Sequence, residues 1–169
     1  MLPFGFVKFT PSSVLLMLLS HYLGLLENSE KQLSDAFEYV SRKHKDEPDI
    51  EHICQKLSAW SREHHGKVMS FCQKYSEQQS SEPDKLKRDL FAEKRSGSLT
   101  LLRNLHDLWL LAQEVQLCWI VIRQAALGLR DEELKATHEF CNARTKRQSD
   151  WLLGRIKQAA PQTLLVAEQ

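Results

Sequence analysis

The sequence has little of what marks several other classes of protein. Glycine and proline are scarce, at 6 and 5 of 169 residues, and this leaves long windows without a helix breaker. The four cysteines form no Cys-x-x-Cys pair and no zinc-finger spacing. The chain also has no glycine-rich phosphate loop, no nucleophile elbow and no Rossmann glycine pattern. These absences predict an all-α protein and favour a non-enzymatic role, although they leave the question of catalysis open.

Neither charge nor hydropathy points to a nucleic acid or a bilayer. Basic and acidic residues balance, 23 against 22, so no sequence-wide basic surface for nucleic acid is expected. No stretch reaches the roughly 18 uninterrupted apolar residues that predict a membrane span. Cysteines without disulfide spacing favour reduced thiols and a cytoplasmic location. Residues 1–12 are interpreted as an apolar arm packed on the protein or on a neighbouring subunit, rather than as a signal peptide.

Apolar residues recur at alternating spacings of three and four, which is the pattern of amphipathic helices that pack as a bundle. We expect one domain over residues 13–158, with Asp49 and Asp131 as N-caps and Pro161 as the stop of the last helix. Residues 159–169 then form a C-terminal tail. The helices are expected at about 13–44, 49–75, 98–129 and 131–158.

The lengths of the connections predict the topology. The first and third links are short, so each joins two helices into an antiparallel hairpin. The second link, residues 76–97, is long and polar. Its residues span up to about 70 Å when extended, more than the length of about 42 Å of a 28-residue helix. It can therefore cross the whole bundle. The helix that follows is apolar almost all round between Leu108 and Ile122, so we expect it to be the buried helix of the bundle.

Two carboxylates occupy corresponding places in the two hairpins. Glu30 lies 34 residues before His64, and Glu114 lies 34 residues before Gln148. The two pairs are related by an offset of 84 residues, so the four side chains are expected at one height. A buried carboxylate is costly unless other groups compensate its charge. This placement therefore predicts a polar site halfway along the bundle.

The chain resembles the ferritin-like superfamily, in particular rubrerythrin and bacterioferritin-type bundles, over about residues 13–158. In that family the first and third helices each carry a Glu, and the second and fourth each carry Glu-x-x-His. Glu30 and Glu114 match the single glutamates, and in the segment from Ser61 to His64 a serine replaces the glutamate. From Thr145 to Gln148 both ligands are replaced.

The resemblance implies an iron or manganese site built from fewer ligands than the family uses. The metal ligands it implies are Glu30, His64 and Glu114, with Glu63, Ser61, Thr145 and Gln148 as neighbouring polar positions. A shift of one residue in the second helix would turn Glu63 or His65 inward instead. The alternative is a metal-free cluster in which Glu30 pairs with a charged His64 and accepts hydrogen bonds from Ser61, Thr145 or Gln148.

Two functions follow from these interpretations. The favoured one is a non-enzymatic bundle that forms homo-oligomers through the apolar start of the first helix, residues 14–19, and keeps a relic polar site. In this interpretation no cofactor is bound. The alternative is a ferritin-like protein that binds Fe or Mn and has an oxidative or stress-related role.

Overall fold

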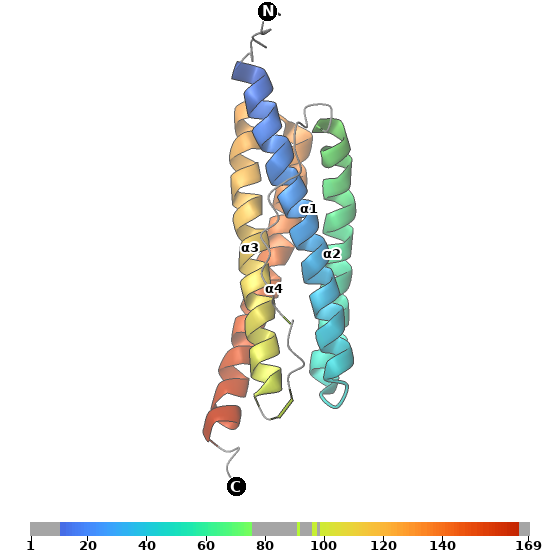
Figure 1. Ribbon diagram of the computed structural model, residues 1–169, viewed down its shortest axis with the longest axis vertical. Coiled ribbons are helices and arrows are strands. Elements are labelled where there is room, and N and C mark those ends of the chain that lie inside the picture. Colours follow the sequence, from blue (N-terminus) through green and yellow to red (C-terminus); the bar gives the residue numbers. More distant parts are fainter. Residues whose placement is uncertain (1–10, 76–90, 92–95, 98, 166–169) are drawn as a thin grey trace, which may run out of the picture.

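The chain forms a bundle of four long helices, and the part that the computed structural model describes contains no strand. The described residues are 11–75, 91, 96–97 and 99–165, with side chains from residue 16 onward. Most of the predicted N-terminal arm (1–10) and of the predicted crossover (76–90, 92–95) lies outside them. The helices are α1 (Pro11–Lys43), α2 (Pro48–Tyr75), α3 (Thr100–Leu129) and α4 (Glu132–Leu165), as Figure 1 shows.

Helices α1 and α2 form one antiparallel pair and α3 and α4 the other, as predicted (Figure 1). Helix α1 also packs on α3, and α2 packs on α4. Helix α2 ends at the end of the bundle opposite to the one where α3 begins (Figure 1), so the connection between them has to cover the length of the bundle. Side chains tie the hairpins together at both ends. Asn104 Nδ2 lies 3.1 Å from His44 Nε2, and the Tyr75 hydroxyl donates to Asp131 Oδ2 at 2.6 Å.

The predicted seam of α1 is confirmed. Its inward positions alternate in steps of three and four because 3.6 residues complete one turn, and they are buried at the centre of the bundle. Glu30 is the one ionisable member of this seam and has no exposed surface. The apolar members are Leu19, Leu23, Leu26, Leu33, Phe37 and Val40.

The helix ends differ in part from expectation. Asp131 is the predicted cap of α4, and its Oδ1 accepts the backbone N–H of Leu134 at 2.9 Å. Asp49 does not cap α2, because that helix begins at Pro48 and places Asp49 in its first turn. Pro161 does not stop α4, which continues to Leu165. Proline removes one hydrogen bond, to the carbonyl of the exposed Lys157, which water can satisfy this close to a helix end.

Helix α3 is not buried on all sides, contrary to expectation. One face packs in the core, but Leu117 is 61% exposed and Ile120 is 47% exposed. Within the described residues, α3 is the one helix long and apolar enough to cross a membrane by length and composition, and half of that apolar window is buried inside the bundle. The apolar residues of α3 therefore divide between two opposite faces.

Candidate functional site

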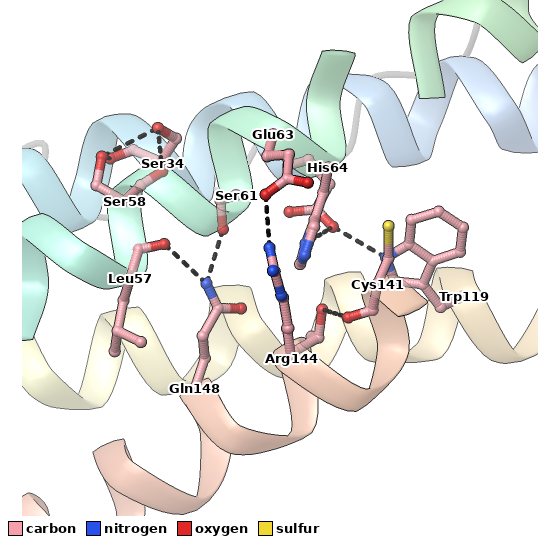
Figure 2. A network of polar contacts seen from close by, with 12 residues as sticks. Ser34, Leu57, Ser58, Ser61, Glu63, His64, Trp119, Cys141, Arg144 and Gln148 are labelled. Carbon is pink, nitrogen blue, oxygen red and sulfur yellow. Dashed lines mark hydrogen bonds and ion pairs between the residues drawn. The ribbon is translucent and has the colours of Figure 1, made fainter. Parts of the chain in front are cut away.

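The predicted polar site exists in the interior, and it is centred on Glu30. The indole Nε1 of Trp119 donates a hydrogen bond to Glu30 Oε1 at 2.9 Å. His64 Nδ1 lies 3.1 Å from the same oxygen, and both side chains of this pair are fully buried. His64 comes from α2 and Trp119 from α3, and Figure 2 shows their side chains close to one another. Three helices thus meet at one carboxylate oxygen.

Three buried polar atoms of these interior side chains have no hydrogen-bond partner. Glu30 Oε2, His64 Nε2 and Gln148 Oε1 are buried and make no hydrogen bond. The free oxygens of Glu30 and Gln148 are acceptors, whereas the role of His64 Nε2 depends on the protonation of the ring. A buried polar atom without a partner costs about 1–3 kcal/mol. The interior therefore holds buried polar atoms without partners on the residues that the sequence pattern indicated.

Gln148 and Ser61 form a separate part of the network rather than binding Glu30. Gln148 Nε2 donates to the carbonyl of Leu57 at 3.0 Å and to Ser61 Oγ at 2.9 Å (Figure 2). Thr145 Oγ1 donates to the carbonyl of Cys141, one turn back in its own helix, at 3.1 Å. Of the partners expected for Glu30 in a metal-free cluster, His64 is confirmed and the other three bond elsewhere.

Trp119 is the member of the site that sequence reasoning missed. It lies in an apolar run of α3, a position that by itself predicts only a core or interface anchor. One signal was available, because a buried indole N–H requires an acceptor and Glu30 is the buried carboxylate of the neighbouring helix. Spacing along the chain could not show that these two side chains meet.

Glu114 lies at the height of Glu30 but outside its cluster. It is half-buried, and its Oε1 accepts a long hydrogen bond of 3.4 Å from Ser29, the residue before Glu30. In the part of the chain that the structure describes, no three His, Cys, Asp or Glu side chains are grouped so as to hold a metal ion. The ligand set Glu30, His64 and Glu114 stays a prediction.

The register of α2 is the one that points His64 inward. Glu63 is exposed and forms an ion pair with Arg144 at 2.6 Å, and the hydrogen bond from Arg144 lowers the pKa of Glu63. His65 is half-buried at the rim, where its Nε2 lies 2.6 Å from Glu27 Oε1. The alternative register, with Glu63 or His65 in the core, is therefore not adopted.

Two cysteines next to the site have thiols that stay protonated near neutral pH. Burial, together with the smaller effect of the negative charges of Glu114 and Glu30, raises the pKa of Cys118 to about 12. Burial also raises the pKa of Cys141, again with a contribution from Glu30. The described cysteines are all free. Because the thiolate is the reactive form, these thiols are not nucleophiles near neutral pH.

His138 lies next to this cluster without a hydrogen bond. It is buried on α4, neither ring nitrogen has a partner, and its ring meets the Trp119 ring edge-on at 6.1 Å. Burial lowers the pKa of His138, so the neutral ring is favoured. It is a core histidine.

No family model, no curated protein and no solved structure matches this chain.

Proposed function

We propose that this protein is a ferritin-like helical bundle that acts by associating with further copies of itself rather than by catalysis. The observation that carries the proposal is the set of large apolar side chains on the outside of α1 and α3. Leu18 is 54% exposed on α1, and Leu117 is the most exposed of those on α3. Contiguous apolar surface of this kind is typical of protein interfaces.

The apolar groups of the two helices lie toward the same end of the bundle. The contacts of Ser29 with Glu114 and of His44 with Asn104 set the antiparallel register of α1 against α3. Tyr22 lies seven residues before Ser29 on α1, and residue 121 lies seven residues after Glu114 on α3. These two positions are therefore at the same height in the antiparallel pair. Tyr22 and Ile120 are both exposed, so the two helices contribute to one region of the surface. This extends the predicted oligomer contact from α1 to α3.

Two observations support the ferritin-like part of the proposal. The helices run as two antiparallel pairs whose connection has to cover the bundle length, which is the ferritin-like order (Figure 1). A carboxylate on α1 also meets a histidine on α2 in the interior. In this interpretation the Glu30 cluster fixes the register of the helices, a role that buried polar groups have in other bundles.

Sedimentation equilibrium over a range of concentrations tests the association. We expect the unmodified chain to form a dimer or larger oligomer, and we expect the double variant Leu117→Lys, Ile120→Lys to be monomeric with an unchanged circular dichroism spectrum. The matched control is Leu153→Lys, a leucine 40% exposed on α4, which should leave the oligomer intact. A monomeric unmodified chain would contradict the proposal.

A second candidate function is binding of Fe or Mn, and the unpaired buried atoms Glu30 Oε2 and His64 Nε2 favour it. A carboxylate oxygen and an imidazole nitrogen fit these metals. The test is the metal content of protein purified from cells supplemented with iron and manganese. Stoichiometric metal that disappears in both Glu30→Ala and Glu114→Ala, but not in the exposed control Glu63→Ala, would support this function. Metal-free protein would contradict it.

A further inference from the structure

The outer face of α3 carries a second seam, directed away from the core. Its six positions are separated by three, four, three, four and three residues, which is the spacing of a two-stranded coiled coil. They lie opposite the core positions Val115 and Ile122, and each is half-buried or exposed. The residues are Leu110, Gln113, Leu117, Ile120, Gln124 and Leu127. Among the four described helices α3 packs on α1 and α4, and none of them packs on this face.

The order of side chains along the seam is the same from either end: Leu, Gln, apolar, apolar, Gln, Leu. In an antiparallel pair of identical helices, layers equidistant from a twofold axis face each other. An axis between residues 118 and 119 places Leu110 opposite Leu127 of the partner subunit and Gln113 opposite Gln124 of the partner subunit. Every apolar layer then meets an apolar layer, and the amides meet each other.

Charges beyond the seam distinguish the antiparallel from the parallel arrangement. Arg103 and His106 are exposed and continue the same spacing toward the start of α3. A parallel pair would set Arg103 against Arg103 of the partner subunit, which is unfavourable. The antiparallel pair sets them near the partner's α3–α4 turn, where the Glu132 and Glu133 side chains are 79% and 77% exposed. The antiparallel arrangement therefore avoids the Arg103–Arg103 contact and brings these basic residues near two carboxylates, although the exposed Arg130 lies in the same turn.

We propose that two copies of this chain pack α3 against α3 in antiparallel orientation, about a twofold axis between residues 118 and 119. The inference rests on the proposed function and specifies its interface. The overlap from Trp109 to Gly128 is about 30 Å long. A single pair of helices of this length makes a small interface compared with the standard one, which buries about 800 Å² per partner. The exposed Leu18 and Tyr22 of α1 add to it, and we expect a reversible dimer of micromolar affinity.

Cysteine cross-linking tests the orientation. Leu110→Cys and Leu127→Cys are made as separate variants, one of them labelled with a heavy isotope so that their masses differ. Each variant is oxidised alone, and the two are oxidised as an equal mixture. A disulfide needs Cα atoms within about 7 Å. In the antiparallel dimer the two copies of residue 110 lie about 25 Å apart along the helix axis. We therefore expect cross-links in the mixture, almost all between the two variants. The unmodified chain, oxidised in the same way, measures cross-linking through the native half-buried Cys72.

The outcomes separate the orientation from the association. Cross-linking of each variant with itself would mean a parallel pair and would overturn this inference, while the proposed function would stand. No specific cross-linking in a sample that sedimentation shows to be dimeric would place the interface elsewhere and also overturn the inference. A monomer that binds phospholipid vesicles would mean that the apolar face of α3 meets lipid, and both proposals would fail.

A charge exchange gives an independent test without new thiols. The variant Gln113→Lys, Gln124→Glu places opposite charges in facing layers of the antiparallel dimer, so its dissociation constant should stay within about threefold of that of the unmodified chain. Gln113→Lys, Gln124→Lys places like charges there, and the dimer should weaken by about tenfold or more. In a parallel dimer both variants would face like charges. Equal weakening of the two would overturn the inference.

Discussion

Two carboxylates, one in the middle of the bundle and one at its end, are bound in different ways. Asp131 at the start of α4 uses both oxygens. Its Oδ1 accepts the N–H of Leu134, and its Oδ2 accepts the Tyr75 hydroxyl and the Lys74 ammonium. Its side chain is only 9% exposed, but the neighbouring Lys74 side chain is 46% exposed. This carboxylate closes the end of α2 onto the start of α4.

Glu30 in the middle of the bundle is more deeply buried and less well satisfied. One of its oxygens accepts both donors, from His64 and Trp119, and the other has none. Stability alone gives little reason for such a cluster, because apolar side chains of similar volume in place of all its members often perform as well or better, whereas removal of one member alone is costly. Asp131 therefore acts as a cap at the end of the bundle, whereas Glu30 specifies how three helices meet at its centre.

The largest effect should come from Glu30→Leu. The substitution leaves the Trp119 N–H and the His64 ring without an acceptor in the core, and we expect the free energy of unfolding to fall by about 3–5 kcal/mol. Urea unfolding measures this change. Glu114→Leu is the matched control, because that carboxylate is half-buried with one long hydrogen bond, and it should cost less than about 1 kcal/mol. Equal effects of the two substitutions would remove the distinction between the central cluster and its surroundings.

A smaller effect, and one that depends on pH, is expected from Asp131→Ala. Burial by itself raises the pKa of Asp131, but the hydrogen bonds from Leu134, Tyr75 and Lys74 outweigh it and lower the pKa to about 2. Its contribution to stability is therefore full above the unfolded pKa, about 4, and is lost as the pH falls towards 2. At neutral pH the variant should lose about 1–2 kcal/mol.

Unfolding in urea at pH 7, 4, 3 and 2 follows the disappearance of this difference. The control is Asp150→Ala, since Asp150 forms only an exposed pair with Lys146 and should show little change at any pH. A loss of stability in Asp131→Ala that is as large at pH 2 as at pH 7 would mean that packing, rather than the charged cap, is responsible.

The smallest effect concerns His138, which packs on the same Trp119 that binds Glu30. Burial, with the charge of Arg123, lowers the pKa of His138, while Glu139 opposes the shift. Below pH 6.5 His138 binds a proton in the unfolded chain but not in the folded chain. The free energy of unfolding therefore falls as the pH decreases from that value. Burial lowers the pKa of His44 in the same direction.

His138→Leu should therefore make the free energy of unfolding less dependent on pH between 6.5 and 5. The change in its slope against pH corresponds to at most one proton. The exposed His52→Leu is the control and should leave this dependence unchanged. If the slope is the same in both variants, His138 is not a source of acid sensitivity at the centre of the bundle.

The periodicity of α1 predicted both the burial of Glu30 and its neighbours in the seam, and the same reasoning placed His64 inward on α2. These predictions succeeded because a helix has a fixed period, so spacing decides which residues share a face. Trp119 escaped prediction because the period of one helix carries no information about which side chain of another helix lies opposite. The height of Glu114 was correct, but its small rotation away from the cluster depends on how α3 packs.

In helix α3 the effect of the sequence and the effect of packing are separated most clearly. Its sequence determines a long helix with apolar residues on two faces, since the spacing of Leu117 and Ile120 is as regular as that of Val115 and Ile122. Only the tertiary structure decides which face is the core, because burial depends on the neighbours that surround a helix and not on its own composition. For the same reason the chain by itself specifies that a carboxylate enters the interior, while the packing of α2 and α3 selects the donors that hold it.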